Sequence, residues 1–445
     1  MMSANTEFEW WRPAPPPRAV SASTSGPTVA QSTLSAWAFR ALITFAAINI
    51  TAPQAIFPVL EPFRLALLSA GMALGAYLLE MWSGAAPTAG RPRELTLGLA
   101  LLAWSAVTLP MSLWPGGSFQ LLTDQFVKSI IIFWLLARVI RTPDQLHKIF
   151  WTLTLVSVPL AYTGIAQFRS GDLERGRITG YASGLTANPN DLAMMVDLIL
   201  PLAATVGLLA RKPWVRVSAF VIVGINLVCL AATSSRGGFV GLAAMLLAAL
   251  VLAARRKKWA VIGLAVVALP IGVALLPSSV TERLATIGSV EADDTGSSQA
   301  RLTGMLAALE YMGSHPIAGA GLGQDVQALV DVLGTGAKWE HVHNSYLVVG
   351  TDLGVVGLAM YLAMVTFAYR RVTKVERESL AAGREDLSYM ASGLKLSFIG
   401  LIVTMFFSPG AYNFPIFYLL GLVLALDVAH RSYSAPVPAV VRERA

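Results

Sequence analysis

The sequence is a succession of long apolar runs separated by short polar segments. Windows of about 19 residues pick out about twelve runs long enough to cross a bilayer. They cover 35–51, 64–83, 95–113, 125–140, 146–168, 190–210, 214–233, 237–254, 259–276, 344–369, 388–408 and 411–429. A backbone in lipid must satisfy its own hydrogen bonds, and runs of this length do so as helices. We therefore expect an all-α, polytopic integral membrane protein with about twelve transmembrane helices.

Composition agrees with this class. The chain is 55% hydrophobic and 13% charged, whereas soluble domains carry about 25% charged residues. Its net charge of +7 comes from short basic clusters between apolar runs, which indicates membrane topology rather than a nucleic-acid partner. Cys229 is the only cysteine, which excludes a disulfide framework, and no Cys/His spacing resembles a zinc site.

Basic residues alternate from one connection to the next, which predicts the orientation. The clusters are Arg91 and Arg93; Arg138, Arg141 and Lys148; Arg211, Lys212 and Arg216; Arg255 to Lys258; and Arg370, Arg371, Lys374, Arg377 and Arg384. Each follows an even number of predicted spans, so the positive-inside rule places the clusters and both termini in the cytoplasm. Any chemistry is then expected on the outer face of the membrane.

Five segments follow from this topology. Residues 1–33 are rich in Pro, Ser and Thr and predict a disordered cytoplasmic tail rather than a cleaved signal. We expect residues 34–276 to form an N-terminal bundle of about nine helices and residues 277–343 to form a large loop on the outer face with short amphipathic helices and the catalytic elements. About three further helices occupy 344–430, and 431–445 is a second cytoplasmic tail.

Two outward segments carry arginine next to helix-start signals. Arg169, Arg175 and Arg177 run against the positive-inside trend and favour an anionic ligand. The run after them contains Asn188-Pro189-Asn190-Asp191, which predicts a helix start capped by Asn188 or Asn190. Arg236 stands in a tight turn beside two glycines that we expect to be flexible. A guanidinium there can extend to lipid headgroups or bind phosphate through its planar fork.

The long outer loop supplies two more candidates. From Arg301, the spacing of Leu302, Met305, Leu306 and Leu309 predicts an amphipathic helix on the membrane surface, its apolar stripe used for ordinary packing. Arg301 would stand at the helix start, where the dipole and free N–H groups favour an anion. The loop then closes on His341, His343, Asn344 and Tyr346, where a span begins. Intramembrane and boundary clusters of this kind are functional-site hypotheses by default.

These segments together resemble the O-antigen ligase and polymerase superfamily of bacterial membrane glycosyltransferases. The carriers are Arg177 to Asp191 with Asn-Pro-Asn, Thr233-Ser-Ser-Arg236-Gly-Gly, the Arg301 helix followed by His315-Pro316 and Gly319-Ala-Gly321, and His343-Asn344-Ser345-Tyr346-Leu347 followed by Gly354 and Gly357. Each motif alone is weak evidence for the family. Their joint presence in this order, along two thirds of the chain, is specific evidence for it.

The resemblance implies a glycan donor on undecaprenyl diphosphate and an acceptor hydroxyl on the periplasmic side, with no metal and no cofactor. Attack opposite the diphosphate would invert the anomeric carbon. Arg236 and Arg301 would stabilise the departing diphosphate and His343 would act as general base. Diphosphate or glycan binding would fall to Arg177, Asn188, Asn190, Asn344, His341 and Tyr346.

Several readings stay open at this point. An O-antigen ligase or a polymerase is favoured over an enzyme with a protein acceptor, since no large soluble domain follows the last span to recruit a protein. The ligase joining the glycan to lipid A-core is the leading assignment. An O-antigen or exopolysaccharide polymerase and a protein O-oligosaccharyltransferase share the motifs. From other classes come a secondary transporter, for which Glu80, Asp197 and Asp352 are the internal acids, and a non-catalytic scaffold of an export complex.

Overall fold

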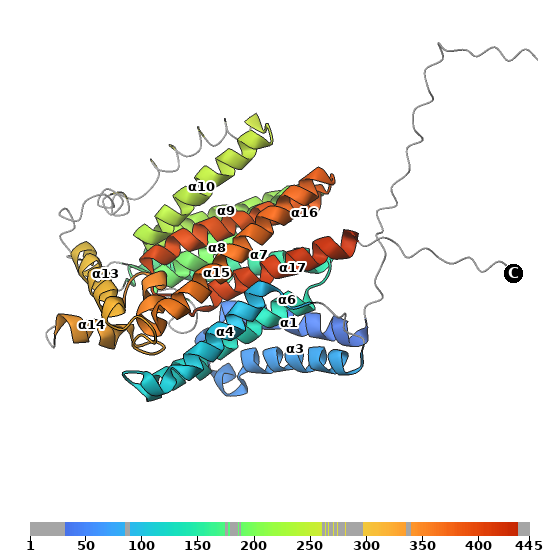
Figure 1. Ribbon diagram of the computed structural model, residues 1–445. Helices are drawn as coiled ribbons and strands as arrows, with labels where there is room; N and C mark the ends of the chain where they lie inside the picture. Colours follow the sequence, from blue (N-terminus) through green and yellow to red (C-terminus); the bar gives the residue numbers. More distant parts are fainter. Residues whose placement is uncertain are drawn as a thin grey trace, which may run out of the picture.

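A computed structural model describes residues 32–84, 90–173, 177, 178, 186, 188–259, 297–334 and 340–434, with isolated residues between 263 and 281. Every secondary-structure element of three or more residues in these ranges is a helix, which confirms the predicted all-α class. Figure 1 shows an elongated bundle of roughly aligned helices, with two short helices at one end.

The first half of the bundle consists of α1 (Thr33–Thr51), α2 (Pro53–Ile56), η1 (Pro58–Phe63), α3 (Leu65–Trp82), α4 (Arg93–Val107), η2 (Leu109–Met111), α5 (Pro115–Leu121), η3 (Leu122–Phe126), α6 (Val127–Val139) and α7 (Pro143–Ser170). The second half consists of α8 (Pro189–Leu209), α9 (Pro213–Thr233), α10 (Arg236–Arg255), α13 (Ser297–Ser314), α14 (Asp325–Leu333), α15 (Ser345–Ala381), α16 (Glu385–Thr404), η5 (Met405–Phe407) and α17 (Phe414–Ser434).

Ten helical segments in the described residues are long and apolar enough to cross a membrane. They coincide with ten of the twelve predicted spans. The run 95–113 is an exception, because its helix α4 has 15 residues and then gives way to a 3-10 turn. The run 259–276 lies almost entirely outside the described residues. α15 extends to Ala381, so part of the basic segment predicted as a loop is helical.

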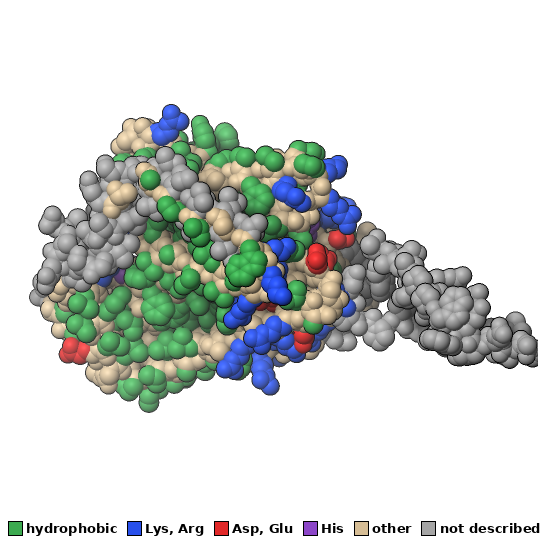
Figure 2. All heavy atoms as spheres, turned by 90° about the horizontal axis from the view of Figure 1, so that it is seen from above, with side chains coloured by type: hydrophobic (Ala, Val, Ile, Leu, Met, Phe, Trp, Pro, Cys, Tyr) green, Lys and Arg blue, Asp and Glu red, His purple; other side chains and the backbone are tan. Residues whose placement is uncertain are grey.

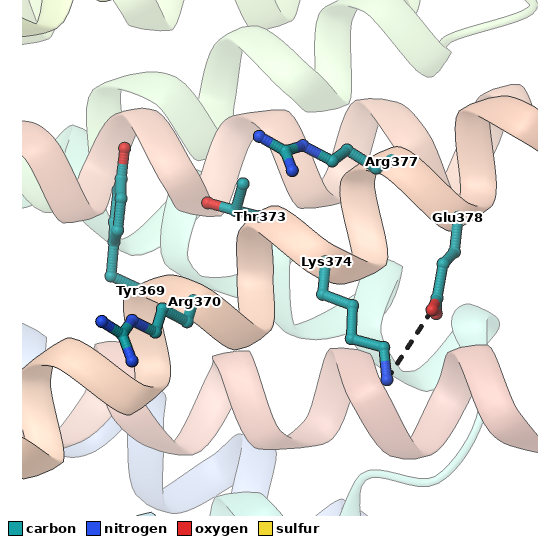
Figure 3. Close-up of a pocket in the computed structure, with 6 residues that line it drawn as sticks. All are labelled: Tyr369, Arg370, Thr373, Lys374, Arg377 and Glu378. Atoms are coloured by element: carbon teal, nitrogen blue, oxygen red, sulfur yellow. Dashed lines mark ion pairs between the residues drawn. The ribbon is translucent and has the colours of Figure 1, made fainter.

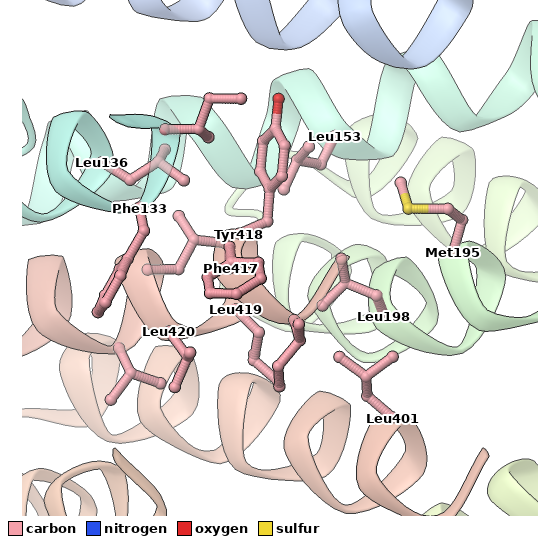
Figure 4. Close-up of a cluster of buried hydrophobic side chains, with 14 of the residues drawn as sticks. Phe133, Leu136, Leu153, Met195, Leu198, Leu401, Phe417, Tyr418, Leu419 and Leu420 are labelled. Carbon is pink, nitrogen blue, oxygen red and sulfur yellow. The ribbon is translucent and has the colours of Figure 1, made fainter. Parts of the chain in front are cut away.

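Two helices form the centre of the bundle. α8 and α17 are apolar all round and are buried over most of their length, which is the pattern expected of helices enclosed by others. In Figure 4, Phe417 to Leu420 of α17 pack among side chains of α6, α7, α8 and α16. The first turn of α8 therefore continues into a helix that is buried over most of its length.

One end of the bundle is rich in cations, and Figure 2 shows most visible lysine and arginine side chains gathered there. Arg141 donates two hydrogen bonds, of 2.7 and 2.8 Å, to the buried carboxylate of Glu80. Arg371 of α15 bonds to Glu94 of α4 and Asp427 of α17. These ion pairs join segments far apart in the sequence. That all the basic clusters face the cytoplasm stays a prediction.

The outer part of α15 is interrupted at Gly354, whose φ of 66° and ψ of −172° are not helical. The glycine-rich run 316–324 crosses this break. Ala320 and Gly321 donate their N–H groups to the carbonyls of Thr351 and Asp352, each at 2.8 Å. The backbone groups released by the break therefore regain partners. Residues 316–323 form an irregular turn, and its hydrogen bonds to α15 anchor the connection from α13 to α14.

Candidate functional site

The predicted site residues lie at the end of the bundle opposite the basic ion pairs. α8, α10 and α15 begin there, and Figure 1 shows α13 and α14 beside this end. Both short helices contact α15. The four polar segments are thus brought together by the starts of three long helices and by the α13–α14 connection.

Arg177 and Asn190 meet at the start of α10. The Arg177 guanidinium donates Nη2–H to Asn190 Oδ1 at 2.9 Å and Nε–H to the Thr233 carbonyl at 3.3 Å. Ser235 Oγ donates to the same Asn190 oxygen at 2.8 Å. Asn190 therefore joins the first two motifs, which sequence spacing alone could not show.

Asn188 caps α8, and it is one of the two residues that the sequence predicted as the cap. Its Oδ1 accepts the N–H groups of Asn190 and Asp191 at 2.8 and 3.2 Å, and Pro189 occupies the first helical position. A cap of this kind contributes about 1 kcal/mol. Because its oxygen is already used, Asn188 positions the site, and its predicted contact with glycan remains a prediction.

Arg236 is the first residue of α10, with Ser235 as the cap. The prediction that its neighbouring glycines are flexible is wrong. Both glycines are helical, and a Cβ at Gly237 would come within 2.6 Å of Phe407, while one at Gly238 would come within 2.7 Å of Ala193. They permit close packing, which fixes the start of α10. Arg236 therefore stands in the first turn of a helix, where the helix dipole and the free N–H groups favour an anion.

Arg301 lies in α13, and the helix predicted there is confirmed. Its start is not at Arg301, however, because α13 begins at Ser297. The free N–H groups belong to the first turn, which ends before Arg301. The prediction that the helix dipole and free N–H groups favour an anion at Arg301 is therefore wrong. Arg301 is half-buried, and its charge lowers the pKa of His343. Its effect on the site is therefore that of a nearby cation.

The apolar stripe of α13 faces away from the bundle. Leu302, Leu306 and Leu309 are 44%, 59% and 51% exposed, whereas Ala307 and Ala308 on the opposite face are buried. The prediction that the leucine stripe serves ordinary packing is wrong, because the buried side chains of α13 are Ala307, Ala308 and Tyr311 on the opposite face. An outward leucine face agrees with the expected position at a membrane surface, which stays a prediction.

His343 lies just before α15 and is surrounded by cations. Its Nδ1 is buried and has no hydrogen-bond partner among the residues that the structure describes. Burial, followed by the charges of Arg301 and His341 and, more weakly, of Arg177, lowers its pKa to about 4. His343 is therefore neutral near pH 7, and one of its ring nitrogens carries a lone pair.

His341 has a different environment two residues earlier. Its Nδ1 lies 3.0 and 3.1 Å from the two carboxylate oxygens of Asp325, the first residue of α14. Asp325 is buried and also accepts the N–H of Val342 at 2.8 Å. The hydrogen bond to Asp325 raises the pKa of His341. Sequence analysis missed Asp325, because nothing in its local sequence indicates a histidine partner.

Two further predicted residues have structural partners. Asn344 caps α15, with Oδ1 accepting the N–H groups of Tyr346 and Leu347. The Tyr346 hydroxyl donates to the Ile402 carbonyl of α16 at 2.8 Å. The structure thus turns Tyr346 toward α16 rather than toward the two histidines. Its predicted role in glycan binding has no support in these contacts.

A shallow pocket of about 400 Å³ lies along the second half of α15, lined by Tyr369, Arg370, Thr373, Lys374, Arg377 and Glu378 (Figure 3). It begins 24 residues after Ser345, which corresponds to roughly 36 Å along a helix. The pocket therefore belongs to the basic end and is separate from the histidine cluster.

Among the described residues, no group of three or more His, Cys, Asp or Glu side chains is arranged to hold a metal ion. The cluster instead offers guanidinium groups and two histidines in different protonation environments. Such a set binds anionic oxygen and exchanges protons with a hydroxyl group.

Residues 219–362 match the O-antigen ligase family. The matched segment runs from α9 to α15 and includes Arg236, Arg301, His341 and His343, while Arg177 precedes it. No curated protein matches the chain. The match confirms, over residues 219–362, the resemblance to the O-antigen ligase superfamily that was stated from the motifs.

Proposed function

We propose that the protein transfers a glycan from undecaprenyl diphosphate to an acceptor hydroxyl at the outer end of the bundle, as an O-antigen ligase joining it to lipid A-core. The main observation in support is that His343 is neutral and lies close enough to Arg301 and Arg177 for their charges to lower its pKa. This arrangement offers positive charge for a diphosphate beside a group that can bind a hydroxyl.

The arginines serve the leaving group. When the glycosidic bond breaks, its electron pair goes to the diphosphate, and the additional negative charge develops on the bridging oxygen. Arg236 and Arg301, with Arg177 as a further contact, would stabilise that charge, because preorganised cations cost little reorganisation during reaction. Fixed positions favour this role: Ser235 caps the helix that begins at Arg236, and Asn190 holds Arg177.

His343 serves the acceptor. Because the two arginines and burial keep it neutral, it can accept a hydrogen bond from the incoming hydroxyl at the pH of the periplasm. A bound diphosphate would offset the charge of the arginines and raise the pKa of His343. Donor binding would thus make His343 a stronger base, which suits a role as the predicted general base. Attack from the side opposite the diphosphate inverts the anomeric carbon.

The acceptor distinguishes the members of this functional class. Lipid A-core would define a ligase, a second lipid-linked glycan a polymerase, and a protein hydroxyl an oligosaccharyltransferase. The exposed leucine face of α13 favours an acceptor that is itself in the membrane, because an apolar helix face beside the site suits lipid rather than water. We place the site on the periplasmic face of the inner membrane, with both termini in the cytoplasm.

A transporter would need ionisable groups along the middle of the bundle. Of the three internal acids, Glu80 pairs with Arg141, and Asp352 accepts the N–H groups of Gly323 and Gln324 near the outer end. Asp197 is the one placed within a central helix, where it accepts the Thr404 hydroxyl. These positions favour the transferase.

Complementation of a deletion strain tests the function. Wild type, His343→Ala and Arg301→Ala would be compared by gel analysis of lipopolysaccharide and glycoprotein, with Arg377→Ala, an exposed arginine at the basic end, as the matched control. We expect the first two variants to reach the membrane and to leave free lipid-linked polymer. Uniform single repeats would indicate a polymerase, and an unglycosylated protein an oligosaccharyltransferase. Normal glycan in both variants would refute the proposal.

A further inference from the structure

Asp197 is a buried acid that the proposed mechanism does not use. It lies on α8, and its side chain is fully buried. Its Oδ2 accepts the Thr404 hydroxyl of α16 at 2.7 Å, whereas Oδ1 is buried and has no hydrogen-bond partner among the described residues. An ionisable side chain within a membrane-spanning helix is costly, and such residues commonly mark functional sites. The neighbours of the Asp197–Thr404 pair indicate which part of the site it serves.

The Asp197–Thr404 pair is in direct contact with the backbone of α10. A Cβ at Gly241 would overlap the Thr404 hydroxyl and come within 2.7 Å of Asp197 Oδ2. The Thr404 hydroxyl oxygen also lies 3.5 Å from the carbonyl oxygen of Gly237, one turn earlier on the same helix. Glycines allow helices in a membrane to approach this closely. α8, α10 and α16 therefore meet at one polar contact, which includes Gly241.

α10 has a second contact one turn nearer to its start. A Cβ at Gly237 would come within 2.6 Å of Phe407. Gly237 and Gly241 lie on the same face of α10, because residues four apart are neighbours on a helix. The buried residues of α10 are these two glycines, Gly238 and Met245. With so few buried residues, α10 depends on the two contacts for its position and its tilt.

The position of α10 determines where the Arg236 guanidinium lies, because Arg236 is the first residue of that helix. Gly241 follows it by five residues, which corresponds to about 7.5 Å along a helix. Preorganised charges stabilise a reacting group only when they are held in place. A displacement of about 1 Å, caused by a change far from the reacting atoms, can lower a rate roughly 100-fold.

We propose that Asp197 and Thr404 are positioning residues, which hold α10 so that Arg236 reaches the donor diphosphate. This inference rests on the proposed function. The Asp197 side chain accepts the Thr404 hydroxyl and thereby fixes the surface against which Gly241 packs. This role needs a hydrogen-bond acceptor at position 197 rather than an acid. A role in carrying protons would need the acid itself.

Binding of undecaprenyl diphosphate to purified full-length protein in detergent tests the inference. Gly241→Ala pushes α10 away from the Asp197–Thr404 pair, and we expect about a tenfold loss of affinity, as for loss of one hydrogen bond to a charged group. Gly224→Ala is the matched control and should bind like wild type, since a Cβ at this exposed glycine of α9 meets no atom within 4 Å.

The hydrogen bond is tested without a change in backbone packing. Thr404→Val removes the hydroxyl at nearly constant volume, and we expect a loss of affinity of about threefold, as for one neutral hydrogen bond. Thr404→Ser keeps the hydroxyl and should restore most of the affinity. Asp197→Asn still offers an acceptor oxygen and should bind like wild type, whereas Asp197→Leu should lose as much as Thr404→Val.

A double mutant shows whether the effect passes through Arg236. Once Arg236→Ala has removed the guanidinium, Gly241→Ala should lower the affinity by less than about twofold more, because both changes remove the same contact. A merely structural role predicts the full tenfold loss in both backgrounds. If Gly241→Ala is not recovered from the membrane, Thr404→Val gives the same comparison.

The outcomes distinguish this inference from the proposed function. If Arg236→Ala weakens binding but Gly241→Ala and Thr404→Val bind like wild type, the inference is wrong. An equal loss in Asp197→Asn and Asp197→Leu would assign the role to the acid itself and would overturn it as well. If wild type does not bind undecaprenyl diphosphate, or Arg236→Ala binds it as tightly as wild type, the proposed function fails instead.

Discussion

The two ends of the bundle hold basic residues in different ways. At the basic end, guanidinium groups meet buried or partly buried carboxylates at 2.6 to 2.8 Å. Arg141 joins the α6–α7 connection to α3, and Arg371 joins α15 to α4 and α17. At the outer end, burial lowers the pKa of the partly buried His343, and the charges of Arg301 and, more weakly, Arg177 lower it further. Ion pairs within the protein, as at the basic end, stabilise the fold. Arginines that make the electrostatic potential around the histidines more positive, as at the outer end, are suited to binding an anionic substrate.

Removing a cation at the outer end is expected to give the largest effect. Arg301→Ala should reduce glycan transfer by about 100- to 1000-fold, as for loss of one preorganised group that stabilises developing charge. Arg236→Lys should also lose activity, because an ammonium lacks the bidentate fork. Transfer rates in membranes at equal protein levels measure both. Rates within threefold of wild type would remove these residues from the reaction.

Breaking an ion pair at the basic end should affect folding instead. Arg371→Ala leaves Glu94, which is 1% exposed, without its partner, and we expect a loss of about 3 kcal/mol in the free energy of unfolding. Denaturation in detergent, monitored by tryptophan fluorescence, measures this loss. Activity per folded molecule should stay near wild type. A stable but inactive variant would show that the two ends do not divide stability and function.

The pKa of His343 gives a smaller effect with a defined sign. Because its folded pKa of about 4 is below the unfolded value of about 6.5, its neutral form stabilises the fold above pH 6.5. That contribution is lost as the pH falls from about 6.5 toward 4. In His343→Gln, the stability should depend less on pH within this window. An unchanged pH dependence would place His343 in a more solvated environment than the structure gives it.

An exposed ion pair at the basic end should contribute least. Lys374 and Glu378 are 3.7 Å apart, and their side chains are 69% and 47% exposed (Figure 3). Lys374→Gln, which leaves the contact of Glu378 with His430 in place, should change the unfolding free energy by about 0.5 kcal/mol or less. Chemical denaturation against wild type gives the value. A loss above about 2 kcal/mol would mean that the pair belongs to the buried network.

The sequence predicted ten of the long helices and the capped starts of two of them, because apolar runs and capping signals are local, whereas the start of α13 and the end of α15 differ from the prediction. The Asn188 cap, the start of α15 after Asn344 and the helix containing Arg301 all follow from spacing. Contacts between distant residues could not be predicted in this way. The Asp325–His341 bond and the meeting of Arg177 with Asn190 depend on packing, as does the outward direction of the leucines on α13.

The central claim is that the donor diphosphate binds at the outer end. Binding of undecaprenyl diphosphate to purified wild type, Arg301→Ala and Arg377→Ala in detergent tests it directly. We predict at least about a tenfold loss of affinity for Arg301→Ala, the expected value of a charge-assisted contact with phosphate, and no loss for Arg377→Ala. Equal affinity in wild type and Arg301→Ala, or a loss confined to Arg377→Ala, would contradict the account.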